Sequence, residues 1–269
     1  MKNDKLTDNM ETHKNLPNSA QNILARVAIP EKIIICLDVC NNESTIPLQA
    51  LKTAVEIFLR LKAQINPRHE FALITLESTK AKWIRNFSNF RNIIKAVQAL
   101  QTVPLDDTSD ETFNLDSLFE MATQCIEIPP FDNESVTLLY PPNYLVRIII
   151  LYTRSKFVPT INVGELLQNQ LTSPYLFIDT VWMHAESNEE NKIEEISKAF
   201  KFIQDNDKSY FFESDYNVIK LQNIMAKLLA HPLQRSLQNS ADFKFTEIND
   251  EVKEISGEEG SEEALNIFA

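Results

Sequence analysis

Three short segments of the chain carry side chains that could bind a metal ion or activate a nucleophile. Asp38 directly follows a run of apolar residues, and Cys40 comes two residues later. Thr112 precedes a helical pattern, and Arg154 follows a second apolar run. Carboxylate and hydroxyl oxygens are the ligands that a hard cation such as Mg²⁺ prefers, and a cysteine thiol becomes a nucleophile when a base lies beside it. The sequence therefore raises two kinds of chemistry, metal binding and nucleophilic catalysis.

Nucleophilic catalysis lacks a base in the sequence. Cys40 has no histidine near it along the chain, and a histidine brought to it by the fold is the one alternative left open. We expect His69 and His184, which begin and end strands, to be surface or edge residues and not general bases. The histidines form no H-E-x-x-H or comparable metal-ligand spacing: His13, His69, His184 and His231. We therefore predict no catalytic residue and no enzyme activity.

The composition excludes several further functions. The chain has 269 residues but only three glycines, which leaves no glycine-rich phosphate loop and no nucleophile elbow. Its three cysteines form no C-x-x-C pair, so we predict neither a disulfide framework nor a thiolate zinc site, as fits a reducing compartment. The formal net charge is −12, with much of the acidity in residues 247–269, so we expect no direct binding to nucleic acid.

Apolar segments of the length needed for targeting or membrane insertion are missing from the sequence. Residues 1–22 are polar and do not resemble a secretory signal. The longest apolar runs, Ile33–Leu37 and Ile148–Tyr152, are much shorter than a bilayer of about 30 Å requires. We therefore expect a soluble intracellular protein that does not contact a membrane.

Alternating strand and helix patterns position the three segments. Six segments are predicted strands: Lys32–Leu37, Phe71–Leu76, Lys82–Phe87, Val146–Tyr152, Tyr175–Trp182 and Ser209–Phe212. The second and third predict an antiparallel hairpin at a sheet edge, and amphipathic helical patterns lie between the others. The sequence thus predicts a doubly wound α/β fold with a mostly parallel six-stranded sheet, one antiparallel edge strand and helices on both faces. The loops with Asp38, Thr112 and Arg154 then meet at the carboxyl edge of the sheet.

These loops resemble the metal site of the von Willebrand factor A domain, and the resemblance implies the fold of that family. The family has D-x-S-x-S, a threonine and T-D-G around a magnesium ion. Here Asp38 and Thr112 are kept, Cys40 and Asn42 replace the two serines, and Arg154 replaces the second aspartate. A fixed positive charge about 5 Å from the ion would repel it by on the order of 3 kcal/mol per unit-charge pair at an effective dielectric constant of ~20. We predict a degenerate site without metal or cofactor, in which Arg154 pairs directly with Asp38.

A narrower resemblance covers roughly Val27 to Ser236. Several segments, above all Met225–Arg235 with the sequence MAKLLAHPLQR, resemble the A-domain subunits of the BRISC deubiquitinase complex and of a related nuclear complex that works with the breast-cancer type one protein. The resemblance implies a non-catalytic scaffold that binds a subunit built from ubiquitin-conjugating-enzyme-variant folds. The complex would also contain a zinc metalloprotease subunit, which cuts lysine-63-linked ubiquitin chains, and its coiled-coil scaffold subunit.

The same resemblance implies a cytoplasmic and nuclear location and roles in DNA repair, chromatin regulation and mitosis. A different class of function stays open, a metal-dependent A-domain receptor for an acidic protein ligand. Magnesium dependence of partner binding distinguishes the two, because only the receptor would need the ion.

The ends of the chain are predicted to lie outside the A-like domain. We divide the sequence into a flexible N-terminal arm (1–26), the A-like domain (27–231) and an extended acidic tail that docks on the partner (232–269). Pro232 ends the last helix, and it either only stops that helix or begins the docking arm. Phe243 and Phe245 alternate with polar residues, a strand-like pattern that favours addition to a partner over self-packing. The predicted partner-binding residues are His231, Pro232, Leu233, Gln234, Arg235, Phe243 and Phe245.

Overall fold

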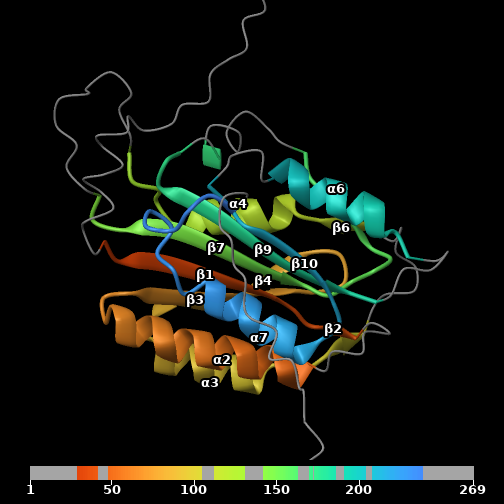
Figure 1. Cartoon of the computed structure of the whole chain (residues 1–269), viewed down its shortest axis with the longest axis horizontal. Helices are drawn as coiled ribbons and strands as arrows, with labels where there is room; N and C mark the ends of the chain where they lie inside the picture. The colour runs from red at the N-terminus through yellow and green to blue at the C-terminus, as the bar shows by residue number, and fades with distance from the viewer. Residues whose placement is uncertain are drawn as a thin grey trace, which may run out of the picture.

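A computed structural model describes residues 29–41, 48–104, 112–130, 142–162, 170–171, 173–185, 191–203 and 208–238 of the chain. One six-stranded sheet runs through this part with the strand order β10-β9-β7-β1-β3-β4 (Figure 1). Its strands are β1 (Glu31–Asp38), β3 (Glu70–Leu76), β4 (Ala81–Ser88), β7 (Leu145–Tyr152), β9 (Leu176–His184) and β10 (Phe211–Asp215). All neighbours pair in parallel except β3 with β4, so the predicted parallel sheet and antiparallel edge hairpin are confirmed.

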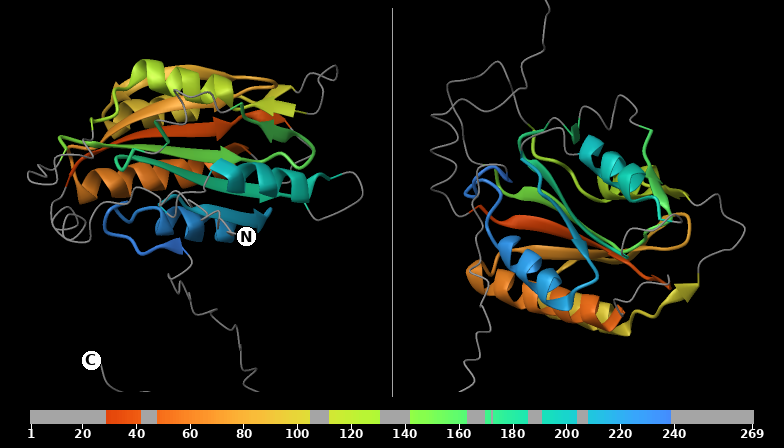
Figure 2. Two further views of the ribbon diagram at one scale, coloured as in Figure 1. Left: turned by 90° about the horizontal axis from the view of Figure 1, so that it is seen from above. Right: turned by 45° about the vertical axis from the view of Figure 1, so that its right-hand side comes forward.

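Helices cover both faces of the sheet, as predicted. Helices α2 (Leu48–Ile65), α3 (Phe90–Ala99) and α7 (Val218–Lys227) pack on one face. Helices α4 (Asp116–Cys125) and α6 (Ile193–Ile203) pack on the other, and Figure 2 shows the same layers from two further directions. Among the helices in the described residues, none has the length and apolar character needed to cross a membrane.

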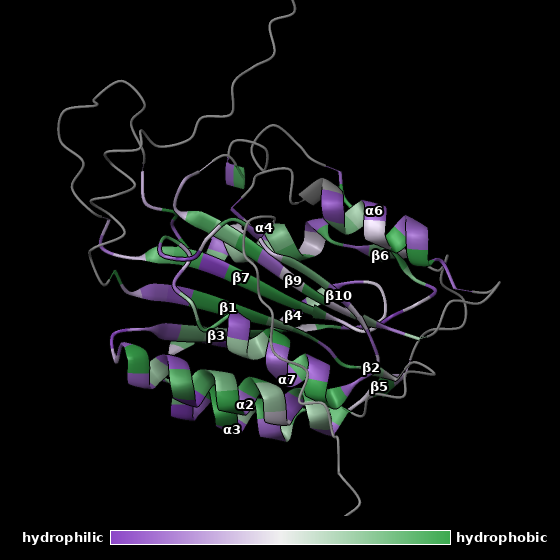
Figure 3. Ribbon diagram, in the orientation of Figure 1, coloured by the Kyte–Doolittle hydropathy of each residue, from purple (hydrophilic) through white to green (hydrophobic). Residues whose placement is uncertain are grey.

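The central strands are apolar on both sides because each side faces a separate core. Ile33 and Ile35 of β1 contact the core under α2, α3 and α7. Ile34 and Cys36 contact the core under α4 and α6. Figure 3 shows this division as strands that are hydrophobic along most of their length beside helices with one hydrophobic and one hydrophilic side. A strand buried on both faces does not need to alternate apolar with polar residues, which explains the continuous apolar runs.

Two small parallel pairings at the carboxyl edge of the sheet were not predicted. Strand β2 (Cys40–Asn41) pairs with β5 (Val103–Pro104), and β6 (Thr112–Asn114) pairs with β8 (Val158–Thr160). These strands have two or three residues each, too few to show a periodic sequence pattern. Cys40 of β2 and Phe113 of β6 both contact Arg154, so these pairings lie beside the sequence-predicted site.

Candidate functional site

Asp38 and Arg154 form a buried ion pair at the carboxyl edge of the sheet. Asp38 is the last residue of β1, and Arg154 lies two residues after the end of the neighbouring strand β7. Their side chains are fully buried. Arg154 Nε lies 3.2 Å from Oδ1 and 3.1 Å from Oδ2 of Asp38, and Arg154 Nη2 lies 3.1 Å from Oδ1. The predicted direct pair is therefore confirmed.

Arg154 is held by the turn between β3 and β4 as well as by Asp38. Its Nη1 donates to the Ser78 carbonyl at 2.7 Å, and its Nη2 donates to the Glu77 carbonyl at 2.7 Å. The ring of Phe113 covers the guanidinium, 4.7 Å from Cζ to the ring centroid. Burial by itself disfavours the charge, but Asp38 outweighs this effect and raises the pKa of Arg154 further above its usual value. The guanidinium is a permanent part of the fold.

The Asp38 carboxylate is fully engaged by protein donors. Besides Arg154, Oδ2 accepts from the Thr153 backbone N–H at 3.2 Å and from the Thr153 hydroxyl at 3.3 Å. Oδ1 also accepts from the Cys40 backbone N–H at 3.2 Å. These bonds leave the carboxylate little capacity to bind anything else.

The described residues at this edge do not fit a magnesium ion. Mg²⁺ needs close to six oxygen ligands in a tight octahedron, and it would have to displace a buried guanidinium from the Asp38 carboxylate. Thr112 is exposed in β6, where it pairs with Val158, and its neighbour Phe113 is the residue that contacts Arg154. Asn42 lies outside the described residues. Within the described ranges, no group of three or more histidine, cysteine, aspartate or glutamate side chains is placed to hold a metal.

Cys40 lies beside the ion pair as a protonated thiol. Its Sγ is 3.3 Å from Arg154 Nη2 and 3.8 Å from the Leu76 carbonyl oxygen. Burial raises the pKa of the Cys40 thiol to about 12, although Arg154 acts in the opposite direction. Because the thiolate is the reactive form, a thiol with this pKa is a poor nucleophile at neutral pH.

A second cluster of buried charges lies toward the amino ends of the same strands, and sequence reasoning missed it. It contains Glu31 of β1, Lys62 of α2, Arg147 of β7, Asp179 of β9 and Arg235 after α7. Arg147 Nη1 lies 3.3 Å from Glu31 Oε2, and Arg147 Nε lies 2.7 Å from Asp179 Oδ2. Lys62 binds Glu31 directly, and Arg235 binds both oxygens of Asp179 at 2.6 and 2.9 Å. The sequence signal is a charged residue inside an apolar run, as with Arg147 in LVRIIILY.

The cluster keeps its carboxylates ionised in spite of burial. Burial alone would raise the pKa of Glu31, but Lys62 and Arg147 outweigh it and hold that pKa below its usual value. Arg147 and Arg235 likewise outweigh burial and lower the pKa of Asp179. Burial lowers the pKa of Lys62 to about 8, against the opposing effect of Glu31. The cluster thus contains three cations and two anions, and Lys62 is the cation that most readily loses its proton.

The expectation that His69 is a surface or edge residue is wrong. His69 is 5% exposed, and its Nδ1 accepts a hydrogen bond of 2.8 Å from the Glu31 backbone N–H. Burial lowers the pKa of His69 to about 4, against the effect of Glu31. The residue precedes β3 at the amino ends of the strands, where its Nε2 lies 3.8 Å from Oε1 of Glu31 in β1. His184 lies partly exposed at the end of β9, as expected, with Nε2 3.5 Å from Glu213.

The predicted docking segment begins as a turn packed on the domain. The Gln234 and Arg235 N–H groups both donate to the His231 carbonyl, at 2.9 and 3.1 Å. Pro232 is buried, and Leu233 packs against an apolar cluster that includes Ile29. Residues 231–235 therefore differ from the extended arm that we expected.

Contacts made by the Arg235 and His231 side chains explain this turn. Arg235 is drawn inward by Asp179 and stacks on Tyr210, 3.8 Å from Cζ to the ring centroid. The His231 ring Nε2 donates to the Ile29 carbonyl at 3.0 Å. The packed region extends to Gln238, whose side chain bonds the Phe211 backbone. Phe243 and Phe245 lie outside the described residues, and their role in binding stays a prediction.

Known proteins similar to this chain share most of its length. No protein-family model matches the chain. The chain is 34% identical over 244 residues to BRISC and BRCA1-A complex member 1 of Xenopus tropicalis, with 85% of this chain and 74% of that protein covered. It is 34% identical over 249 residues to BRISC and BRCA1-A complex member 1 of Homo sapiens, with 86% and 72% covered.

A solved structure shares the fold at low sequence identity. The pilus adhesin SpaC from Lactobacillus rhamnosus GG superimposes with a TM-score of 0.50 at 10% identity, over 77% of this chain and 31% of that chain. The SpRpn10 VWA domain superimposes with a TM-score of 0.48 at 13% identity, over 77% of this chain and 99% of that chain.

Removing one partner of the Asp38–Arg154 pair should cost more stability than removing both. Asp38→Leu or Arg154→Met alone leaves a buried charge without its partner, and we expect either to lower the free energy of unfolding by about 3–5 kcal/mol. The double variant leaves neither charge and should lose less than either single variant. Denaturant unfolding of the four proteins measures the differences.

The exposed pair of Glu56 and Arg60 is the matched control for this experiment. Arg60→Ala should cost no more than about 1 kcal/mol, because exposed ion pairs contribute little. A double variant at Asp38 and Arg154 that loses as much as the two single variants together would contradict the prediction.

Acid should destabilise the fold partly through His69. Its pKa is about 4 in the folded protein and near 6.5 when unfolded, so the unfolded chain gains a proton first as the pH falls. The contribution of His69 to the free energy of unfolding is on the order of 3 kcal/mol. It is fully present above pH ~6.5 and is lost as the pH falls toward ~4. In His69→Gln the unfolding free energy should fall less steeply across this window. His231, whose pKa is also lowered by burial, retains part of the slope. Parallel curves for the two proteins would refute the role of His69.

Proposed function

The chain belongs to the family of BRISC and BRCA1-A complex member 1, and we propose that it acts as a non-catalytic scaffold subunit of a deubiquitinase complex of this kind. The Asp38–Arg154 pair is the observation that supports a scaffold most directly. It occupies the edge of the sheet where an A domain of the metal-dependent class would hold its ion. Binding through protein surfaces is then the function that remains for the domain.

We propose that the direct partner is the subunit built from ubiquitin-conjugating-enzyme-variant folds. Through it, the chain would stabilise an assembly with the zinc metalloprotease that cuts lysine-63-linked chains and its coiled-coil scaffold subunit. Such a complex would act in the cytoplasm and the nucleus. This proposal rests on the resemblance of the segment Met225–Arg235 and on the similarity to the named relatives.

The turn at residues 231–235 reduces the number of residues in this segment that could contact the partner. His231, Pro232 and Arg235 are committed to contacts within the domain, whereas Gln234 is exposed. A truncation at Pro232 would therefore remove Arg235 from buried Asp179 and damage the domain itself. Substitution of Phe243 and Phe245 avoids this complication, because it leaves Arg235 in the chain with its bonds to Asp179.

Substitution of the two tail phenylalanines should weaken the partner complex. In the full chain, Phe243→Ala with Phe245→Ala should weaken the affinity for the ubiquitin-conjugating-enzyme-variant subunit about tenfold, because the two rings are proposed to bury as interface anchors. The yield of co-purified subunit should fall accordingly. The matched control is Asp242→Ala with Lys244→Ala, which changes the opposite side of the same strand-like pattern and should retain the partner. Equal retention by both double variants would remove the phenylalanines from the interface.

The alternative, a metal-dependent receptor for an acidic ligand, predicts the opposite response to metal. Because Arg154 already neutralises Asp38, we expect partner binding to be the same in Mg²⁺ and in excess chelator. The measurement is the dissociation constant of the partner complex under both conditions. Binding that is lost in chelator, and lost again in Asp38→Asn with Mg²⁺ present, would favour the receptor.

A further inference from the structure

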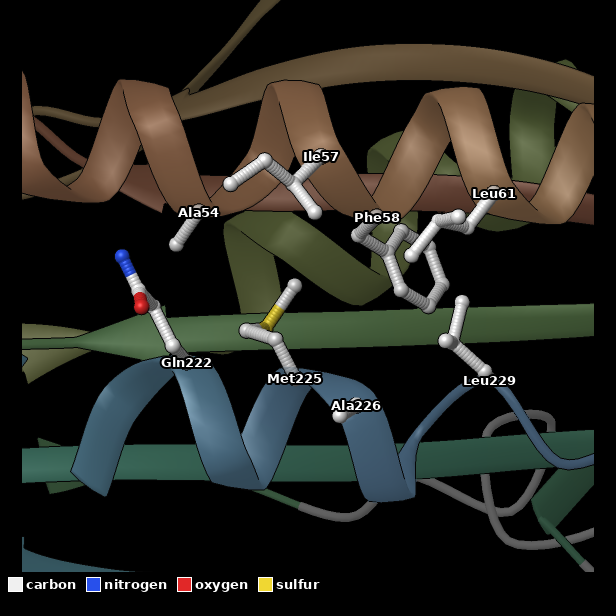
Figure 4. A pocket seen from close by; sticks show the side chains of 8 residues that line it. All are labelled: Ala54, Ile57, Phe58, Leu61, Gln222, Met225, Ala226 and Leu229. Carbon is white, nitrogen blue, oxygen red and sulfur yellow. The ribbon is translucent and has the colours of Figure 1, made fainter. Parts of the chain in front are cut away.

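An apolar groove runs between helices α2 and α7. Ile57 and Leu61 of α2 line one side, and Met225 of α7 and Leu229, just after α7, line the other, with buried Phe58 between them (Figure 4). Ile57 is 44% exposed and Leu61 is 38% exposed, and Ile65, one turn further along α2, is 60% exposed. Residues four apart share one side of a helix, so these three form a continuous apolar stripe open to solvent. A stripe of this kind is typical of a helix that packs against another element.

The first described residue enters the fold at one end of this groove. Both helices run in the same direction in Figure 4, from Ala54 and Gln222 toward Leu61 and Leu229. At the Leu61 and Leu229 end of the groove, Lys62 Nζ donates to the Leu229 carbonyl at 3.2 Å. Two residues after Leu229, the His231 ring donates to the Ile29 carbonyl at 3.0 Å. The residues before Ile29 therefore continue from a point beside the Leu61 and Leu229 end of the groove.

The sequence directly before Ile29 has the pattern of an amphipathic helix. Apolar side chains occur at the i, i+3, i+4 and i+7 positions of one helical face: Ala20, Ile23, Leu24 and Val27. Ser19 precedes them as a residue type that caps helices, and Pro30 restricts Ile29 to an extended conformation, which would end the helix. Nine helical residues span about 13 Å, and the stretch of α2 from Ala54 to Leu61 spans about 10 Å.

We propose that residues 20–28 form a helix that packs into the groove between α2 and α7. Ile23, Leu24 and Val27 bury against Ile57, Leu61 and Leu229, and the segment runs parallel to the two helices. It needs no linker, because its last residue adjoins Ile29 at the end of the groove. The tail after Gln238 is placed less favourably, since Gln238 is fixed to the Phe211 backbone at the β10 edge of the sheet. The arm that the sequence first suggested to be flexible is then a cover for the domain.

Cysteine accessibility in the full chain tests this packing. Leu61→Cys is introduced together with Cys125→Ser, which removes the one native cysteine that is exposed; Cys36 and Cys40 are buried. We expect slow reaction of the new thiol with a maleimide reagent. Adding Ile23→Asp and Leu24→Asp should speed the reaction by at least ~10-fold, because charged residues cannot bury in the groove. The control pair Gln21→Asp and Asn22→Asp adds the same charge on the polar face and should keep the slow rate.

Three outcomes would overturn the proposal. One is a fast reaction in the parent protein, as expected of an open groove. Another is a slow reaction that persists in the Ile23→Asp, Leu24→Asp protein, which would assign the cover to another segment or to a partner. The last is protection that weakens on dilution in the parent, which would assign it to a second copy of the chain.

Discussion

Charges buried inside the sheet must be paired, and this requirement organises the two central strands. Strand β1 begins with Glu31 and ends with Asp38, while Arg147 lies within β7 and Arg154 follows it. Each arginine binds the acidic residue at its own end of β1. A shift in the register of β1 against β7 would separate both pairs at once and leave buried charges without partners, at a cost of several kcal/mol each. The pairs therefore specify one alignment of the strands.

The same requirement separates this domain from A domains that depend on a metal. A bound ion can leave, so an edge that holds one can exist in occupied and empty states. The Arg154 guanidinium is covalently part of the chain and stays charged at any physiological pH. The positive charge beside Asp38 is then constant, which suits a subunit whose surfaces position other proteins. The thiol of Cys40 beside the pair is buried and stays uncharged, because burial raises its pKa to about 12.

The sequence predicted the interaction between residues that follow recognisable strand patterns. It missed interactions between side chains that are far apart in the sequence and have no local pattern. Asp38 directly follows one apolar run and Arg154 comes two residues after another, so the parallel sheet brings them together, and their pairing could be predicted. The Glu31 cluster joins residues from four elements and from the segment after α7, with no local spacing to indicate it. His69 was misplaced for the same reason, because its hydrogen-bond partner Glu31 is 38 positions away in the sequence. The turn at 231–235 depends on Arg235 reaching Asp179, which is 56 positions away in the sequence.

Gln238 has a consequence for the solubility of the protein. Its side-chain amide accepts from the Phe211 N–H at 2.7 Å and donates to the Phe211 carbonyl at 2.6 Å. Phe211 begins β10, the outermost strand on that side of the sheet, and an open outermost strand invites pairing with strands of neighbouring molecules. By imitating one step of a β-ladder with a side chain, Gln238 closes the start of this edge. Pairing with the sheet of another molecule is then blocked at this step of the edge, which favours the soluble molecule.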